Sequence, residues 1–137
     1  MMAAMKDESS HDEAKRKSLR SILRTLNAFS ADIEASAGIS TDGIMLASVL
    51  AENTDQDRFG AMCASLLALA DRAAQEIARG TLKQVLIEGD RGVMLLVYAG
   101  RDAVLAVAAR PTVNLGMVFI EARKTAAKIE EAMRGGL

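Results

Sequence analysis

The sequence has very few of the side chains on which most enzymes and metalloproteins depend. Its 137 residues include one histidine, one cysteine, one proline, one tyrosine, three phenylalanines and no tryptophan. Without a second histidine or cysteine there is no ligand set for zinc, and we expect no metal. The single cysteine, Cys63, has no disulfide partner in the chain, which favours a reducing compartment.

The sequence also lacks a dominant charge and a long apolar run. Seventeen basic and eighteen acidic side chains give a formal net charge of −1, so no long-range field attracts nucleic acid. No stretch approaches the roughly 18 apolar residues of a membrane span, and the start MMAAMKDESSHDEAKRK lacks the apolar core of a signal peptide. We therefore expect a cytoplasmic protein that neither binds nucleic acid nor inserts into a membrane.

No residues form a recognisable catalytic or cofactor site. His11 lies in a polar tail, and Cys63 lies inside a predicted helix, away from the helix end that would lower its pKa. The Gly-rich loops that bind nucleotide phosphates are missing. Asp42-Gly43 and Asp90 with Gly92 have too few oxygens for calcium and fit turns better. We predict no catalytic residue, no enzyme activity and no cofactor.

The apolar pattern predicts one domain, residues 13–137, after a disordered polar tail at residues 1–12. Helical spacing runs from Glu13 to about Ser30. The alternating stretch IEASAGIS, the Asp-Gly pair and the stretch IMLASVL then predict an antiparallel hairpin.

Three further strands are predicted at 82–88, 93–99 and 103–109. The first alternates polar and apolar residues, as an edge strand does, whereas the other two are apolar on both faces. Helices should therefore cover both faces of the sheet. Arg110-Pro111 ends the last strand, and a final helix begins near Asn114, giving the order α-β-β-α-β-β-β-α.

The stretch DRFGAMCASLLALADRAAQEIARG, residues 57–80, predicts a helix of about two dozen residues. Thr54 and Asp57 resemble a capping box at its start, and Gly80 is typical of a helix end. Its large residues should pack on the sheet: Phe59, Met62, Leu66, Leu69, Ala73 and Ile77. A second row is small: Gly60, Ala61, Ala64, Ser65 and Ala68.

The small row predicts a second helix at close range. Alanine alone is explained by helix propensity, but glycine costs up to about 1 kcal/mol relative to alanine, and nothing local requires Gly60. The edge strand that follows would leave its backbone groups unpaired. We therefore predict a homodimer formed by residues 57–88. The expected interface residues are Gly60, Ala61, Ala64, Ser65, Ala68, Lys83, Val85 and Ile87.

Three stretches together resemble the Roadblock (dynein light chain) domain family, which includes bacterial regulators of the MglB type. They are DIEASAGISTDGIMLAS, FGAMCASLLALADRAA and VNLGMVFIEARKTA, and the resemblance spans Leu19 to Met133. It implies a Roadblock/profilin-like α/β (α+β) fold, with the long helix on one face of a five-stranded antiparallel sheet and the other two helices on the opposite face. It also implies a dimer in which the long helices pair and the sheets join through the following strand.

The same resemblance implies a non-catalytic interaction module. Family members regulate Ras-like small GTPases or serve as adaptors in dynein and endosomal scaffolds, so we expect a homodimer that regulates or scaffolds such a GTPase. Two alternatives stay open: a small-ligand sensory domain, and a structural adaptor with no GTPase partner. A sensory domain needs a cavity with convergent polar groups, and the two most apolar strands offer only Tyr98.

Overall fold

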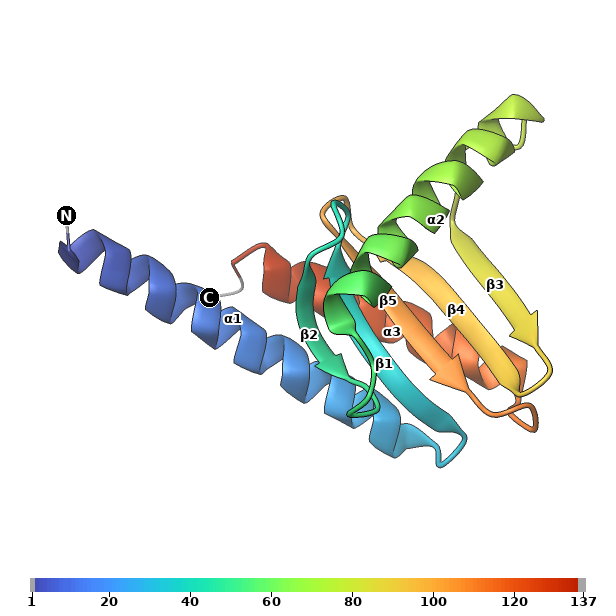
Figure 1. The fold of residues 1–137 in the computed structure, drawn as a ribbon, viewed down its shortest axis with the longest axis horizontal. Coiled ribbons are helices and arrows are strands. Elements are labelled where there is room, and N and C mark those ends of the chain that lie inside the picture. Colours follow the sequence, from blue (N-terminus) through green and yellow to red (C-terminus); the bar gives the residue numbers. More distant parts are fainter. Residues whose placement is uncertain (1, 136–137) are drawn as a thin grey trace.

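The structure, a computed structural model, describes the backbone of residues 2–135 and the side chains of residues 12–135. Its elements follow the predicted order (Figure 1). They are α1 (Met2–Phe29), β1 (Ile33–Ser40), β2 (Met45–Val49), α2 (Gln56–Glu76), β3 (Gln84–Gly89), β4 (Gly92–Ala99), β5 (Ala103–Ala109) and α3 (Leu115–Met133). The predicted fold class is confirmed.

The five strands form one antiparallel sheet in the order β2-β1-β5-β4-β3. The predicted hairpin joins β1 to β2, and Gly43 in its turn has φ of 96°, a conformation that favours glycine. As predicted, the strand after the long helix is an edge strand. The sheet therefore has two edges, β3 on one side and β2 on the other.

Helices cover both faces of the sheet, as the apolar strands β4 and β5 predicted. α1 and α3 lie side by side on one face, and α2 crosses the other (Figure 1). On the α1 and α3 side, a large cluster includes Leu19, Leu23, Leu105 and Ile129, all at most 1% exposed. The cluster under α2 is smaller, and α2 itself contributes only Cys63 and Leu67 to its fully buried members. The α2 layer is therefore the more weakly packed one.

The first helix begins earlier than its apolar pattern predicts. The backbone is helical from Met2 rather than from Glu13, because the polar residues before Glu13 include no proline or glycine that would stop a helix. The side chains of residues 1–11 lie outside the described part of the chain. The division into a tail at 1–12 and a domain at 13–137 stays a prediction.

The ends of α2 also differ from the prediction. Its N-cap is Asp55, whose side chain accepts a hydrogen bond from Arg58 N at 3.1 Å, and not Thr54. The helix ends at Glu76, before the expected Gly80, because Ala78 adopts a left-handed φ of 57° and turns the chain. The strand that follows accordingly starts at Gln84 rather than at residue 82.

Candidate interaction surface

The side of α2 that packs on the sheet matches the predicted row of large residues only in part. The buried residues of α2 are Gly60, Cys63 and Leu67. The large residues left exposed are Met62, Leu69 and Ile77, with exposed fractions of 59%, 66% and 65%. Phe59 and Leu66 are half-buried and do contact the core under α2, so the predicted row is only partly correct.

Gly60 has a structural role inside the domain, contrary to the prediction. A Cβ at Gly60 would lie 2.7 Å from the carbonyl oxygen of Gly43 and 3.7 Å from a methyl group of Ile39. On the helix side, a Cβ added at Gly43 would lie 3.3 Å from Ala61 Cα and 3.5 Å from Ala64 Cβ. The small residues at 60 and 64 thus allow α2 to cross directly over the β1–β2 turn, and Gly60 is not available to a partner.

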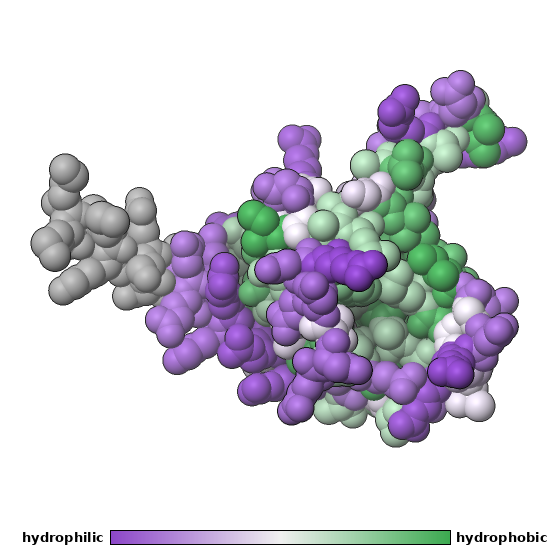
Figure 2. Space-filling view, viewed as in Figure 1, coloured by the Kyte–Doolittle hydropathy of each residue, from purple (hydrophilic) through white to green (hydrophobic). Residues whose placement is uncertain are grey.

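The rest of the predicted small row is on the surface. Ala61, Ser65 and Ala68 are exposed, and they share one side of α2 with Met62 and Leu69. We call this side the exposed α2 face; its members are Ala61, Met62, Ser65, Ala68, Leu69 and Ala73, and the exposed Arg58 and Arg72 lie on the same side. Apolar side chains gather along α2 and continue towards β3 (Figure 2). The face combines small residues, which permit close approach, with two large apolar ones.

The second half of α2 extends beyond its own domain. Figure 1 shows its last turns projecting past the end of the sheet, and from Ala68 to Glu76 none of its residues is buried. Helices shorter than roughly 12–15 residues are only marginally stable in water without packing partners. A projecting helix with exposed Leu69 is therefore expected to pack on another surface.

The β3 edge lies beside this projecting helix. Val85 is half-buried on the α2 side of the sheet, Ile87 is 39% exposed, and Lys83 precedes the strand and is exposed. β3 pairs only with β4, so within the described chain its outer backbone groups have no strand partner. An identical strand from a second copy could satisfy them.

A hydrogen bond holds α2 and the start of β3 in a fixed relation. The Asp71 side chain on α2 accepts a hydrogen bond from Leu82 N at 3.1 Å, and its second oxygen accepts one from Gln75 Nε2 at 3.0 Å. Partial burial, together with the charge of Asp71, raises the pKa of Tyr98 on β4, so Tyr98 stays protonated at neutral pH. Because the hydrogen bond from Leu82 N to Asp71 ties α2 to the start of β3, the exposed α2 face and the β3 edge can act as one surface.

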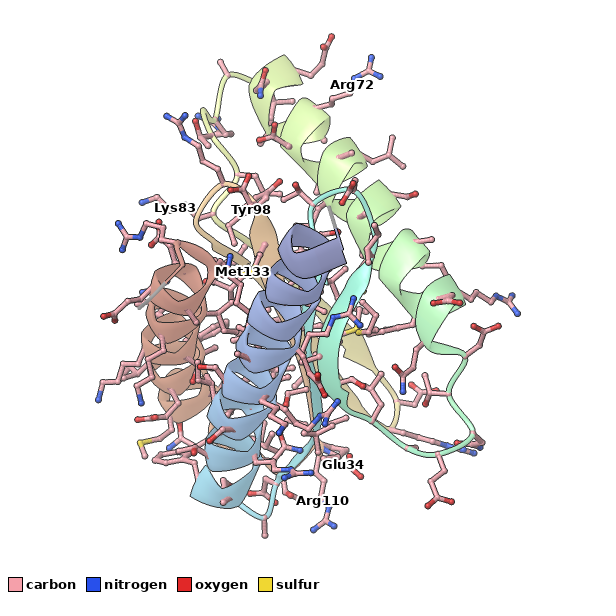
Figure 3. All side chains as sticks on the ribbon, turned by 90° about the vertical axis from the view of Figure 1, so that its left-hand side faces the viewer. Glu34, Arg72, Lys83, Tyr98, Arg110 and Met133 are labelled. Atoms are coloured by element: carbon pink, nitrogen blue, oxygen red, sulfur yellow. The ribbon has the colours of Figure 1, made fainter. Side chains whose placement is uncertain are left out.

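Three arginines of α2 and the loop after it point into solvent. Arg58, Arg72 and Arg79 are all exposed, and Arg72 points away from the domain on the projecting half of α2 (Figure 3). None of the three is among the ion pairs of the described residues. They are available to an acidic partner, although exposed cations on helices are common in any soluble protein.

The side chains that could carry chemistry are not grouped. Cys63 is buried on the side of α2 that faces the sheet, and burial raises the pKa of its thiol to about 11. The side chain of His11 lies outside the described part of the chain. Within residues 12–135, no three His, Cys, Asp or Glu side chains come together as a metal site. None of the described helices has both the length and the apolar character needed to cross a bilayer.

We expect Cys63 to resist alkylation in the folded protein. A pKa of about 11 instead of 9.0 lowers the thiolate fraction near pH 8 roughly a hundredfold, and burial also blocks the reagent. The stability linked to this thiol is present below about pH 9 and is lost between about pH 9 and 11, because only the unfolded state ionises in that range. Iodoacetamide labelling followed by mass spectrometry should be fast only in urea. Equal rates in the native protein would contradict this expectation, and Cys63→Ala should remove this part of the pH dependence.

The hollows under α2 and at the β3–β4 turn do not form an enclosed ligand site. The space between α2 and the sheet, lined by Phe59, Met94 and Ala106 among others, is about 10 Å³, which is about one water molecule. A larger hollow of about 570 Å³ is an open groove at the β3–β4 turn, where Ile87 is flanked by Asp90. This groove continues the surface formed by β3.

Comparison with known proteins identifies relatives of this chain. Residues 30–109 match the family described as Roadblock/LC7 domain. The uncharacterized protein MJ1340 of Methanocaldococcus jannaschii is 39% identical over 98 residues, which are 72% of this chain and 85% of the relative. The structure of Myxococcus xanthus MglB has a TM-score of 0.80 at 16% identity and covers 89% of this chain and 92% of its own. A Roadblock/LC7 domain from Streptomyces avermitilis has a TM-score of 0.78 at 18% identity and covers 84% and 97%.

Proposed function

The chain belongs to the Roadblock/LC7 domain family, and from this premise we propose that it is a homodimeric, non-catalytic interaction module that regulates a Ras-like small GTPase. The family resemblance suggests the GTPase, and the single cysteine suggests that the dimer works in the cytoplasm. The observation that carries the proposal is the projecting half of α2 (Figure 1), on which Leu69 is left 66% exposed by its own domain.

A two-fold dimer accounts for both open features of the chain. Two-fold dimers are the commonest oligomers, and they use the same surface on each copy. In this dimer the exposed α2 faces pack against each other and the β3 edges pair, so that the two sheets join into one. Ala61, Ser65 and Ala68 then allow the helices to approach closely, while Met62 and Leu69 supply the apolar area that is buried.

The dimer offers a GTPase a surface that neither copy has alone. The paired helices form one rigid layer, and Arg58 and Arg72, which helical spacing places among the residues of the exposed α2 face, lie within or beside the paired surface. Such a layer can bind one conformation of the partner's switch loops more tightly than the other and so shift the equilibrium between them. We assign no arginine finger, because none of the ion pairs or side-chain hydrogen bonds of the described residues holds the side chain of Arg58, Arg72 or Arg79.

The GTPase proposal is tested by nucleotide turnover. Ras-like GTPases from the same organism should co-purify with the dimer, and their rate of GTP hydrolysis or nucleotide exchange should change by about tenfold or more, which is a typical size for coupling between two sites. A variant that is folded but monomeric should lose this effect. Absence of both binding and a rate change with every such GTPase would contradict the proposal and would favour a structural adaptor.

The sensory alternative has little support in the structure. Its ligand would have to bind between α2 and the sheet, where the cavity is only about 10 Å³. Few polar groups lie near the core between α2 and the sheet, and Tyr98 is half-buried beside that core. A metabolite that stays bound through purification would reverse this conclusion.

A further inference from the structure

The edge of the sheet opposite β3 is a second open edge with an unusual neighbour. β2 pairs with β1 on one side only, and none of the hydrogen bonds of the described loops or side chains reaches its outer side. Its sequence, MLASV, contains no charge and no proline. Charged residues and proline are the usual devices that keep an edge strand from pairing with another chain, so β2 is open to pairing.

Three arginines line the flank of α1 next to this edge. Arg16, Arg20 and Arg24 are spaced by four residues and are all exposed, so they lie along one side of the helix. Lys15 donates a hydrogen bond to the Met133 carbonyl oxygen of α3 at 3.2 Å, which places α3 on a different side of α1. Figure 3 shows α1 with α3 on one flank and β2 on the other.

A second contact fixes how α1 is turned. Ser36 Oγ of β1 donates a hydrogen bond to Asn27 Oδ1 of α1 at 2.6 Å. Asn27 lies three residues after Arg24, on the same flank of the helix. α1 packs on β1 and β2, whereas α3 packs on β4 and β5. The flank of α1 that lies away from α3 is therefore the one turned to the β2 edge. The N-terminal half of α1 also extends past β2 (Figure 1), so a further strand on β2 would lie against this helix.

The three arginines make no ion pair in the described part of the chain, and the described carboxylates on the same helix are Asp12 and Glu13, four and three residues before Arg16. The ion pairs there are Arg110 with Glu34 and Lys124 with Glu121, and neither involves α1. Like charges four residues apart destabilise a helix. The surface where α1 leaves the sheet is strongly hydrophilic (Figure 2). An exposed row of three arginines that form no ion pair within the described chain favours a negatively charged binding partner, above all at Arg20 and Arg24, which lie farther from Asp12 and Glu13.

From these features we infer that the β2 edge and the three arginines of α1 bind an extended, acidic segment of another protein. The segment adds a strand to β2 through backbone hydrogen bonds, and its carboxylates, on alternate residues, face Arg16, Arg20 and Arg24. This inference goes beyond the dimer and the GTPase, and it depends on neither, because β2 and β3 are opposite edges of the sheet.

A peptide fits this surface better than a membrane or a nucleic acid does. Lipids and nucleic acids cannot supply a strand of backbone donors and acceptors. In addition, exposed carboxylates lie at both ends of β2. They belong to Asp42 in the β1–β2 turn and to Glu52, Asp55 and Asp57 just after the strand. They would repel a uniform polyanion, whereas a strand can present acids to α1 and uncharged residues to the other face.

The test uses a labelled synthetic peptide in which glutamate alternates with valine or threonine, titrated into the full chain and followed by fluorescence anisotropy. We expect binding, and protection of residues 45–49 from amide hydrogen exchange. The triple variant Arg16→Glu, Arg20→Glu, Arg24→Glu should bind about tenfold more weakly or worse. The matched control Lys124→Glu, Lys128→Glu reverses two exposed charges on α3 and should change the affinity less than about twofold. Thermal unfolding of both variants checks that they remain folded.

A pair of N-methylated peptides tests the added strand itself. Methylating one set of alternate backbone nitrogens removes the donors that face β2, and methylating the other set removes donors that face solvent. One of the two peptides should lose binding and the other should keep it. Equal binding of both, protection at β3 instead of β2, an equal loss with the α3 variant, or no binding of the parent peptide would each overturn the proposal.

Discussion

Leu69→Glu is expected to convert the dimer into a folded monomer. Leu69 is 66% exposed within one chain, so the charge costs the monomer little. In a two-fold interface the leucine is buried twice, and burying one leucine contributes about 1.5–3 kcal/mol. Losing both raises the dissociation constant by about two to four powers of ten, and the two glutamates would also have to be desolvated. Sedimentation equilibrium at micromolar concentrations measures this directly.

Ile120→Glu is the matched control for this variant. Ile120 is similarly exposed, at 54%, but it lies on α3, on the opposite face of the sheet. The control should remain dimeric, and circular dichroism should show both variants folded. If the unaltered chain is monomeric, or if Ile120→Glu separates the copies as well as Leu69→Glu does, the interface proposed for α2 and β3 is wrong.

The order of the elements could be predicted because each depends on local signals. The Asp42-Gly43 turn specified the hairpin, and the apolar strands β4 and β5 specified two covered faces. The final helix does begin beside Asn114, which caps it by accepting a hydrogen bond from Met117 N at 3.2 Å. Alternation in the sequence also indicated that β3 is an edge. These patterns depend on residues close together in the chain, so a sequence is sufficient to recognise them.

The side of α2 that faces the sheet could not be predicted in the same way. Apolar residues occur all around this helix, so their spacing indicates a helix without showing which side is buried. The deciding contact is between Gly60 and Gly43, which are far apart in the sequence. Size alone suggested that large residues pack inside and small ones face a partner. Close approach to a backbone turn reverses that rule at Gly60, while Met62 and Leu69 are left outside.

The predicted end of α2, at Gly80, was also wrong because a contact between residues distant in the sequence decides it. The sequence rule assigns the left-handed residue after a helix to glycine, and Gly80 was the obvious choice. Gly80 is indeed left-handed, with φ of 83°, but the chain turns first at Ala78, where φ is 57°, and Arg79 N donates a hydrogen bond to Ala74 O at 2.7 Å. The link from Asp71 to Leu82 N then sets the path into β3. A contact across eleven residues outweighs the local preference.

Gly60→Ala is expected to destabilise the fold, although alanine is the better helix former. The helix gains up to about 1 kcal/mol from the substitution. The new Cβ, however, would lie 2.7 Å from the Gly43 carbonyl oxygen, a backbone atom that cannot move without shifting the β1–β2 turn. Overpacking of this kind costs typically 1–3 kcal/mol and can cost more. We therefore expect a net loss of about 1–2 kcal/mol or more in the free energy of unfolding, measured by urea titration.

Gly116→Ala is the control that separates the clash from helix propensity. Gly116 lies in the first turn of α3, and the nearest atom to its added Cβ would be the Asn114 side-chain oxygen at 3.4 Å, which is ordinary contact. Because only the propensity term operates there, this substitution should leave the protein as stable as before or stabilise it by up to about 1 kcal/mol. Opposite signs for the two variants would establish that α2 is seated on the hairpin through Gly60. If Gly60→Ala stabilised the protein as Gly116→Ala does, α2 would not be in close contact with the β1–β2 turn. The assignment of its buried and exposed sides, from which the dimer is inferred, would then be wrong.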